Sequence, residues 1–249
     1  MDADNVILKT ENLCRSFGAL KAVDDVSLEI TRGEVHAIIG PNGAGKTTLM
    51  DVIVNRTPAT SGKVFFEGRE ITMVPAHKIV RAGLCKCFQI SMLFMKQTCV
   101  ENVRVALIVK HQKTFDLLPK SEAYLREEAL EILDLVGIRH LADETAAYLS
   151  YGDQRRLEIA ITLALEPKLL MLDEPTSGVS ITEGKEIMNM VIDLVKKRGL
   201  TVVFIEHNMD IIFNYADRIS VMNHGQLIAT DTPQRIRENE FVKEAYIGG

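Results

Sequence analysis

The residues best suited to chemistry lie in one short stretch, GPNGAGKTT at 40–48, which fits the phosphate-binding pattern GxxxxGK[ST]. Its glycines lack a Cβ, so successive backbone N–H groups can turn inward onto phosphate oxygens. We expect Lys46 to reach the β- and γ-phosphates of a nucleoside triphosphate and Thr47 to hold Mg²⁺. The residues predicted to contact the nucleotide here are Gly40, Pro41, Asn42, Gly43, Ala44, Gly45, Lys46, Thr47 and Thr48.

Two elements must hold this loop in place. The apolar run EVHAIIG before it predicts a strand, and TTLMDVIVN after it predicts a helix. The positive end of that helix would face the bound anion. A strand, a glycine loop and a helix in this order favour a nucleotide site over the alternative, an ordinary glycine turn, which needs neither flanking element.

A second candidate site lies at Asp173 and Glu174, directly after the apolar run LLML at 169–172. Sheets of α/β proteins bind ligands at the carboxyl ends of their strands. Because neighbouring residues of a strand face opposite sides, we expect Asp173 to bind Mg²⁺ beside Thr47, and Glu174 to orient and deprotonate the attacking water. The alternative is an exposed turn before Pro175, and a phosphate loop on the same chain favours the Mg²⁺ role.

The stretch LSYGDQRR at 149–156 precedes another apolar-periodic run, LEIAITLAL. Ser150 with Asp153 three residues later is a capping-box pattern, and helix capping alone would explain both residues. A Ser hydroxyl, the Gly152 amide and a helix N-terminus also form an anion site, which one phosphate loop by itself would not require. From the residues alone, both interpretations stay open.

The rest of the chain predicts the sheets that carry these residues. VILKT and VSLEI, separated by GALKAVDD, and GKVFFEG at 62–68 indicate short antiparallel strands joined in hairpins. The runs TVVFI at 201–205 and ISVM at 219–222 are nearly all apolar, as is LLML. Such runs are typical of strands buried on both faces of a parallel sheet.

Helices are predicted between these strands. KEIMNMVIDLVKKRG places apolar residues on one stripe and ends in basic residues and Gly199, a typical helix stop. Strand signals vanish between Phe88 and about Glu166. There a 3.6-residue period runs from the candidate cap Ser121 to Gly137, so this part of the chain is predicted to be mostly helical.

Length and composition fit one large globular domain. The chain has 249 residues, of which 47% are hydrophobic and 25% charged, an ordinary profile for such a protein. We expect a single α/β domain over 1–249, with no internal repeat and no second unit. Residues 1–87 and 167–249 would form a parallel-sheet core with an antiparallel β part, and about 88–166 a helical insertion.

Charge and cysteine content narrow the function classes. The net charge is −5 and Lys and Arg are scattered, which argues against a nucleic-acid partner. The four cysteines, at 14, 85, 87 and 99, suit neither a zinc knuckle nor a CxxC redox pair, so we expect reduced, mostly buried thiols in a cytosolic protein. No apolar run approaches the ~18 residues that span a bilayer, and the acidic start MDADN is wrong for a secretory leader. Any membrane role must therefore act through a partner.

These motifs, in this order, resemble the ATP-binding subunits of ABC transporters from about residue 6 to 249. GPNGAGKTT is similar to the family's Walker A motif, LLMLDE to Walker B and LSYGDQ to the ABC signature. Gln89 in CFQ lies where the family has its Q-loop glutamine, and His207 in FIEHN where it has the switch histidine. Phe17 in CRSFGALKAV lies where the family stacks an aromatic ring on adenine; core packing is the alternative for a lone Phe.

The resemblance implies a P-loop NTPase fold of the RecA-like type with a helical signature subdomain, and ATP with Mg²⁺ as cofactors. Gln89 would join Thr47 and Asp173 at the metal and assist Glu174 in catalysis, while His207 would contact the γ-phosphate. The family also implies a head-to-tail dimer with an identical copy or a related paralogue, in which each ATP lies between Walker A of one subunit and the signature of the other. The signature residues that would contact the nucleotide in this way are Ser150, Tyr151, Gly152 and Asp153.

Within the family, the SYG signature, the opening FxALKAVDDVSL and the terminal VKEAYIGG look like subunits that serve importers of branched-chain amino acids. Importers of urea, amides and aromatic acids share much of this pattern. This resemblance implies transmembrane permease subunits as direct partners, a solute-binding protein as an indirect one, and a peripheral location at the cytoplasmic face of the membrane. ATP-driven closure and release after hydrolysis would then move the helical insertion.

Two positions depart from the family pattern. Asp153 stands where Gln is usual, so that helix-dipole stabilisation and phosphate repulsion oppose each other there. Ser180 stands in TSGVS where the D-loop generally ends in Asp. Directly after Gln89, the run ISMLFM at 90–95 is apolar enough to be either core or a docking groove for a permease helix.

Three alternatives from other classes remain. A non-transport ABC ATPase acting on DNA or ribosomes would share the motifs, but such proteins usually carry long coiled coils, zinc modules or two fused cassettes, which this sequence does not show. A P-loop kinase would transfer phosphate to a small molecule instead of to water. A binding-only regulator is the third, because of Asp153 and Ser180.

Overall fold

A central parallel sheet carries the phosphate-binding stretch. The computed structural model describes residues 5–87, 93–111 and 119–242. Within them the sheet runs in the order β11-β10-β4-β9-β8-β7, parallel throughout except for the edge pair β10 and β11. Its strands are β4 (Val35–Ile39), β7 (Leu84–Cys87), β8 (Leu169–Asp173), β9 (Thr201–Ile205), β10 (Arg218–Asn223) and β11 (Gln226–Asp231).

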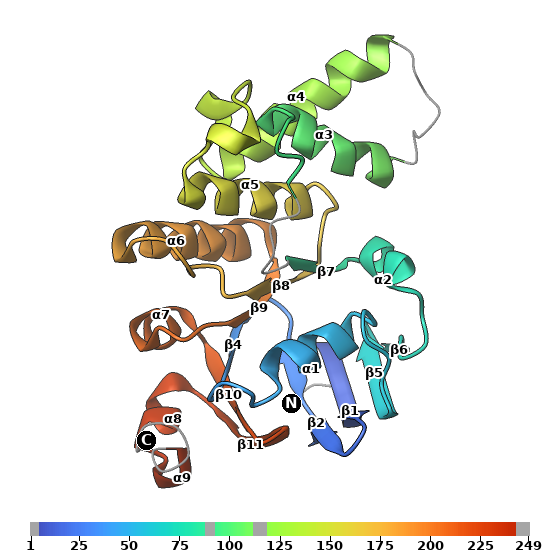
Figure 1. Cartoon of the computed structure of the whole chain (residues 1–249), viewed down its shortest axis with the longest axis vertical. Helices are drawn as coiled ribbons and strands as arrows, with labels where there is room; N and C mark the ends of the chain where they lie inside the picture. Colours follow the sequence, from blue (N-terminus) through green and yellow to red (C-terminus); the bar gives the residue numbers. More distant parts are fainter. Residues whose placement is uncertain (1–4, 88–92, 112–118, 243–249) are drawn as a thin grey trace.

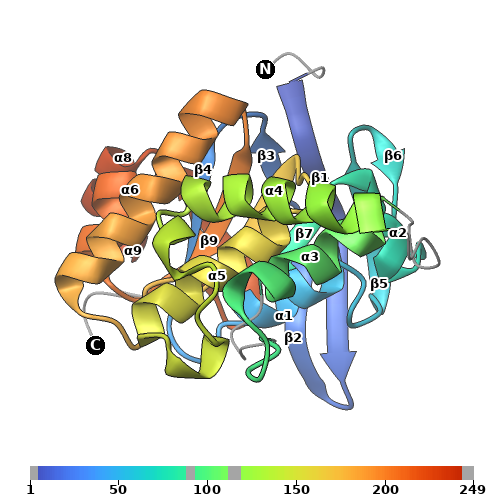
Figure 2. The same ribbon diagram turned by 90° about the horizontal axis from the view of Figure 1, so that it is seen from above.

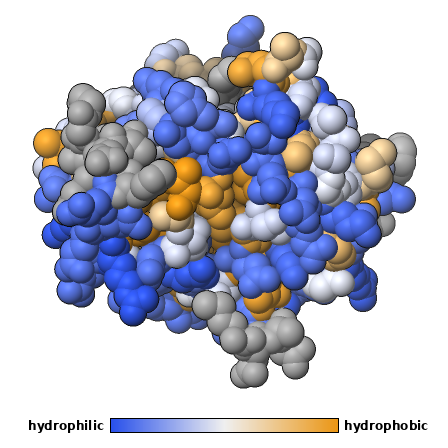
Figure 3. All heavy atoms as spheres, turned by 90° about the horizontal axis from the view of Figure 1, so that it is seen from below, coloured by the Kyte–Doolittle hydropathy of each residue, from blue (hydrophilic) through white to orange (hydrophobic). Residues whose placement is uncertain are grey.

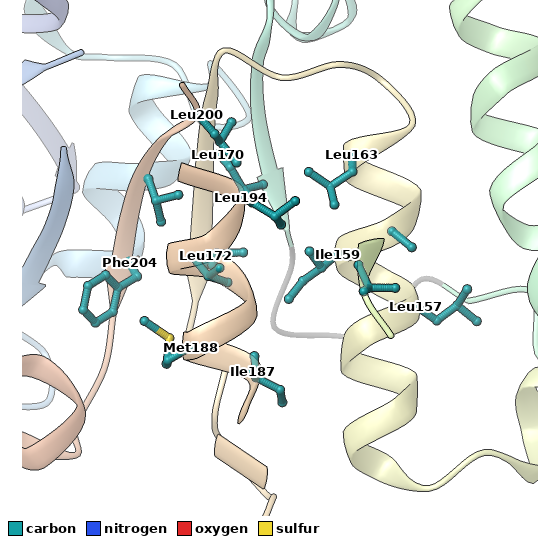
Figure 4. Close-up of a cluster of buried hydrophobic side chains, with 14 of the residues drawn as sticks. Leu157, Ile159, Leu163, Leu170, Leu172, Ile187, Met188, Leu194, Leu200 and Phe204 are labelled. Atoms are coloured by element: carbon teal, nitrogen blue, oxygen red, sulfur yellow. The ribbon is translucent and has the colours of Figure 1, made fainter. Parts of the chain in front are cut away.

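The three central strands, β4, β8 and β9, are buried along their whole length, as their apolar sequences predict. Residues of β8 alternate between two separate apolar cores, with Leu170 and Leu172 in one and Leu169 and Met171 in the other. Figure 4 shows the first core, in which Leu172 lies among side chains of the helices that cover this face. The predicted parallel strands at 169–172, 201–205 and 219–222 are therefore confirmed.

A second, antiparallel sheet packs on the other face. Its order is β2-β1-β5-β6, and β3 also pairs with β1. This confirms the predicted hairpins, with one correction: GALKAVDD, predicted as a separator, lies mostly in strand β2. The reason is that β2 fully buries only Val23 and Val26 and is irregularly paired, so it shows no apolar alternation. The strands of this sheet are β1 (Val6–Phe17), β2 (Leu20–Val26), β3 (Glu29–Thr31), β5 (Ser61–Phe66) and β6 (Arg69–Glu70).

Helices lie at one end of the molecule, on the flank formed by α7 and α8, and at α1 against the antiparallel sheet (Figure 1). Helices α3, α4 and α5 pack on one another at the end opposite the antiparallel sheet, where α5 also contacts β7, and α6 lies beside α5 (Figures 1 and 2). The described residues from 93 to 166 contain no named strand, as predicted, while the division into subdomains remains a prediction. The helices are α1 (Lys46–Ile53), α2 (Ala76–Ala82), α3 (Cys99–Lys110), α4 (Pro119–Leu135), α5 (Tyr151–Leu163), α6 (Ile181–Arg198), α7 (Met209–Tyr215), α8 (Pro233–Glu238) and α9 (Glu240–Val242).

The ends of two helices test the capping predictions. Helix α6 ends at Gly199, whose φ of +63° is the left-handed conformation predicted for a helix stop. Helix α4 covers Pro119–Leu135, so Ser121 lies within the helix and the prediction that it is the cap is wrong.

Among the described residues, no helix combines the length and the apolar character that crossing a bilayer requires. Seen from below, the surface is mainly hydrophilic, with hydrophobic side chains gathered near the middle of that face (Figure 3).

Strand β4, which leads into the phosphate loop, carries a buried polar residue. His36 contacts Glu34 through Nδ1 at 3.1 Å and Ser220 through Nε2 at 2.7 Å. Burial lowers the pKa of His36 from its ordinary value, and the neighbouring Glu34 carboxylate opposes that shift without cancelling it. The folded protein therefore favours the neutral imidazole.

This burial predicts an acid-sensitive stability. Below the ordinary histidine pKa of about 6.5, the unfolded chain binds a proton that folded His36 does not, so the free energy of unfolding falls as pH decreases from there to the folded pKa. The slope from this one group is at most about 1.4 kcal/mol per pH unit. Urea unfolding between pH 7.5 and 5.5 should show a steeper loss for the wild type than for His36→Gln, and equal slopes would contradict the prediction.

Candidate active site

The phosphate loop joins β4 to α1 and is pressed against two neighbouring segments. Gly40, Gly43 and Gly45 have φ of +152°, +78° and +97°, all in the region that favours glycine. A Cβ on Gly40 would lie 2.1 Å from the Met222 carbonyl oxygen, and one on Gly45 would lie 2.0 Å from that of Ala22. Two of the three glycines are therefore required by space as well as by conformation.

The loop opens into a cavity of about 430 Å³, large enough to hold part of a nucleotide. Phe17, at the end of β1, lines this cavity and is 48% exposed, so the core-packing alternative for this residue is wrong. The Arg15 guanidinium lies over the Phe17 ring, 4.3 Å from its centroid, in a cation–π contact. The lining residues are Phe17, Leu20, Lys21, Ala22, Asn42, Gly43, Ala44, Gly45, Lys46, Thr47, Thr48, Glu174, His207 and His224.

Lys46 supplies the positive charge of the cradle. It begins α1, is buried, and its Nζ donates hydrogen bonds to the carbonyl oxygens of Gly40 at 2.7 Å and Pro41 at 3.0 Å. Burial lowers its pKa, whereas the nearby carboxylates of Glu174 and Asp173 act to raise it. Together with the N-terminus of α1, this cation gives the cavity the charge that phosphate requires.

Thr47 and Asp173, two of the predicted Mg²⁺ ligands, come from different elements and lie next to each other. Thr47 Oγ1 donates to Asp173 Oδ1 at 3.4 Å, and Asp173 is buried at the end of β8. Hydroxyl and carboxylate oxygens are the ligands that Mg²⁺ prefers beside substrate phosphates. These residues therefore fit a magnesium site next to the phosphate loop.

Sequence reasoning missed the partner that holds the other oxygen of Asp173. Lys86 Nζ lies 3.1 Å from Asp173 Oδ2 and donates to Asp51 Oδ1 at 2.8 Å. The signal was a single charged residue inside the otherwise apolar run LCKCF at 84–88. A buried cation between two carboxylates thus lies directly beside the predicted metal ligand.

Glu174 and His207 face each other across the ends of β8 and β9. Glu174 Oε1 lies 3.1 Å from His207 Nε2, and both residues line the cavity. The expectation that strand alternation separates Glu174 from Asp173 needs correction, because β8 ends at Asp173 and Glu174 has a left-handed φ of +52°. The turn, and not the strand, directs this carboxylate toward the cavity.

A second missed residue, Glu206, holds this turn. Glu206 is buried, and its Oε1 accepts hydrogen bonds from the backbone N–H and the hydroxyl of Thr176 at 2.8 and 2.6 Å. Its Oε2 accepts from the backbone N–H of His207 at 3.1 Å. One carboxylate therefore links the segment after Glu174 to His207, and its position directly after TVVFI was the available sequence signal.

The signature segment lies elsewhere on the chain's surface. Ser150 caps α5, accepting from the Asp153 backbone N–H at 3.1 Å, which confirms its capping role. The predicted capping box is incomplete, because Asp153 Oδ2 accepts from the Ser150 hydroxyl at 2.7 Å and not from the Ser150 backbone N–H. Tyr151 is half-exposed, and a Cβ on Gly178 would lie 2.7 Å from its ring. None of Ser150, Tyr151, Gly152 and Asp153 is among the residues that line the cavity in the described part of the chain.

Ser180, one of the two departures from the family pattern, has a structural role. It caps α6 in a complete capping box, in which its hydroxyl donates to Glu183 Oε2 at 2.6 Å and accepts from the Glu183 backbone N–H at 3.3 Å. Ser and Asp are comparably good N-caps, so this position keeps its local function.

Some predictions concern other parts of the chain. Gln89, predicted as a metal ligand and catalytic residue, lies outside the described residues, as do 90–92 of the run ISMLFM. In that run Leu93 is buried, whereas Phe94 and Met95 are exposed, so the described half is partly core and partly surface.

The prediction of mostly buried thiols holds for two of the four cysteines. Within the described residues no disulfide forms; Cys85 and Cys99 are buried, whereas Cys14 and Cys87 are partly exposed. Burial raises the pKa of Cys85 to about 12 and that of Cys99 to about 11, which disfavours the reactive thiolate.

A glycine-rich phosphate loop lies at the carboxyl edge of a parallel sheet, where Asp173 ends β8 and where Glu174 and His207 follow β8 and β9; this arrangement defines a P-loop nucleoside triphosphatase. Comparison with known families specifies the type. The family model described as ABC transporter matches residues 23–177. The chain belongs to this family, as an ATP-binding and ATP-hydrolysing subunit, which confirms the resemblance seen in the motifs.

Curated relatives match over nearly the whole length. The high-affinity branched-chain amino acid transport ATP-binding protein LivG of Salmonella typhimurium is 38% identical over 97% of this chain and 98% of its own. BraF of Pseudomonas aeruginosa, which carries the same description, is 38% identical over 97% and 98%. LivG of Escherichia coli K12 is 36% identical over the same shares.

Solved structures confirm the ABC ATPase fold. A nucleotide-free ATP-binding cassette from an ABC transporter is 35% identical with a TM-score of 0.87, covering 98% of this chain and 100% of that chain. An ATP-binding cassette in its ADP conformation is 33% identical with a TM-score of 0.84, covering 98% and 99%. A dimeric cassette in a post-hydrolysis state bound to ADP and Pi is 26% identical with a TM-score of 0.78, covering 91% and 99%.

The loop geometry predicts a matched pair of glycine variants. Gly45→Ala should abolish measurable binding of a fluorescent ATP analogue and destabilise the fold, because the new methyl group would overlap the Ala22 carbonyl. Gly33→Ala is the control, since Gly33 also has a positive φ, +73°, but nothing within 4 Å of the added Cβ. It should lose only about 1–2 kcal/mol in the free energy of unfolding and keep its ATP affinity. Unchanged ATP binding by Gly45→Ala would contradict this reading of the loop.

Proposed function

We propose that this chain powers an importer of branched-chain amino acids or related small solutes, hydrolysing magnesium-bound ATP between two ATP-binding subunits. The relatives named for branched-chain amino acid transport support the solute class, since each matches over nearly its full length. The second subunit is an identical copy or a related paralogue. Urea, amides and aromatic acids are the alternative solutes.

The observation that carries this proposal is the division of the site. The cavity with Lys46 and the α1 N-terminus is one anion site, and the exposed Ser150 at the α5 N-terminus is another that does not line it. One triphosphate can contact both kinds of anion site only if a second subunit supplies the site at Ser150. The dimeric relative bound to ADP and Pi supports such an assembly.

The residues around the cavity each have a chemical role in this proposal. Lys46 and the loop amides neutralise the phosphates, and Thr47 and Asp173 would hold Mg²⁺, which when bound withdraws charge from the phosphate oxygens. Glu174 takes the proton of the attacking water. His207, 3.1 Å from Glu174, orients that carboxylate and lies close enough to the cavity to reach the γ-phosphate.

Gln89 is proposed as a further metal ligand at the start of the helical insertion. The insertion would move when ATP closes the dimer and again when hydrolysis opens it. That movement is the step that couples hydrolysis to the permease.

Asp153 adds a constraint to the signature. In the single subunit the Ser150 hydroxyl donates to Asp153, so it has to change its acceptor before it can donate to a γ-phosphate. Asp153 stabilises the N-terminus of α5 but repels the incoming phosphate. We therefore infer that Asp153 weakens the closed dimer, and that a Gln at this position would strengthen it.

Permease subunits are the direct partners in this proposal, and a solute-binding protein is an indirect one. The chain would lie at the cytoplasmic face of the membrane, held there by the permease. Nucleic acid is not a partner, consistent with the net charge of −5.

The first test removes the proposed base while keeping its shape. Glu174→Gln should bind ATP with affinity within about threefold of the wild type, lose at least about 100-fold in turnover because no group accepts the proton, and accumulate a dimer. Phosphate release and light scattering in the presence of Mg²⁺ and ATP would measure both effects. Glu70→Gln, on the edge strand β6, is the control and should behave like the wild type. Normal hydrolysis by Glu174→Gln would remove Glu174 as the base.

The second test addresses the transported solute. The chain should co-purify from its native membrane with permease subunits, and the reconstituted complex should hydrolyse ATP faster when a branched-chain amino acid and the solute-binding protein are added. Stimulation by urea, amides or aromatic acids instead would replace the solute class. A complex that lacks any permease subunit would contradict the role in transport.

A further inference from the structure

Lys86 lies in an unusual electrostatic position beside the proposed metal site. Its side chain is 2% exposed, and its Nζ contacts Asp51 Oδ1 at 2.8 Å and Asp173 Oδ2 at 3.1 Å. Asp173 uses its other oxygen, Oδ1, to accept from Thr47 at 3.4 Å. The same carboxylate is therefore shared between the proposed metal ligand set and a buried cation.

Without the Lys86 cation, the carboxylates of Asp51 and Asp173 would lose the positive partner that they share. Both oxygens contact one nitrogen atom, so they lie near each other, and Asp173 is itself buried. A buried carboxylate that loses its partner carries a large desolvation cost, which a divalent cation with oxygen ligands can offset. Arg56 also approaches Asp51 at 3.8 Å, but its side chain is 52% exposed, so solvent screens that pair.

We propose that Lys86 is a positioning residue that occupies the Asp51 and Asp173 pair as an internal counter-ion, so that a divalent cation binds at Asp173 only together with the nucleotide. The phosphates would supply the negative charge that the pair lacks while Lys86 is present. This proposal rests on the proposed role of Asp173 as a metal ligand.

The fold gives Lys86 a fixed place from which to do this. Lys86 is on β7, which pairs in parallel with β8, and Asp51 is on α1, the helix that follows the phosphate loop. The three residues thus join β7, α1 and the end of β8. In the sequence, β7 ends at Cys87, two residues before Gln89.

The test measures Mn²⁺ binding to the full-length protein without nucleotide, by electron paramagnetic resonance of the free ion. The wild type and Lys86→Arg, which keeps the positive charge, should bind Mn²⁺ weakly and alike. Lys86→Gln and Lys86→Met should each bind one Mn²⁺ at least tenfold more tightly. The double variant Lys86→Met with Asp51→Asn should lose that gain, because one carboxylate is gone.

A surface control separates this effect from a general loss of charge. Lys168→Gln removes a lysine that pairs with Glu67 on the surface, away from the cavity, and should leave Mn²⁺ binding unchanged. A purely structural role for Lys86 would lower the unfolding temperature of Lys86→Gln without any gain in Mn²⁺ affinity. That result would overturn the proposal, and so would tight nucleotide-free Mn²⁺ binding by the wild type.

Folding of the variants is part of the test. If Lys86→Met is unstable, Mn²⁺ should raise its unfolding temperature in the absence of nucleotide, since the ion replaces the lost cation. Failure of both Lys86→Gln and Lys86→Met to fold in excess Mn²⁺ would contradict the proposal. Mg²⁺-dependent ATP hydrolysis by Thr47→Ala, measured separately, tests the proposed metal site itself, and loss of this hydrolysis is expected. A failure of the metal site is therefore distinguishable from a failure of the role proposed for Lys86.

Discussion

The parallel pairing of β4, β9 and β8 is the constraint on which the site depends. In this register, Ile205 of β9 lies opposite Ile38 of β4 on one side and opposite Asp173 of β8 on the other. Three chain segments therefore end at one edge of the sheet. The phosphate loop, the Glu174 turn and the segment at His207 therefore meet without any of them being close in sequence. Because these strands are buried on both faces, the edge is held rigidly by the two apolar cores.

The charged groups at this edge all have partners within the chain. Lys46 is engaged by loop carbonyl groups, Lys86 lies between Asp51 and Asp173, and Glu174 contacts His207. Each contact occupies a group that the proposed reaction needs, so binding of magnesium and ATP would exchange internal partners for external ones. This exchange gives a physical reason why the site can respond to the nucleotide as a switch.

The sequence predicted the parts of this arrangement that leave local marks. The loop at 40–48, the buried strands and the capping role of Ser150 were read correctly because glycine spacing, continuous apolar runs and cap chemistry are local properties. Strand β2 was missed because it is half-exposed and irregular, and Lys86 was missed because its partners are distant in the chain. Contacts of that kind depend on the folded sheet and cannot be read from neighbouring residues.

We propose that each ATP is held between the cavity of one subunit and the signature segment of another. The most direct test is a crystal structure of Glu174→Gln with magnesium and ATP. We expect a dimer in which the Ser150 hydroxyl and the Gly152 N–H of one copy lie within hydrogen-bonding distance of the γ-phosphate held by Lys46 of the other. A γ-phosphate enclosed by one copy alone, with the signature segment facing away in every assembly, would contradict it.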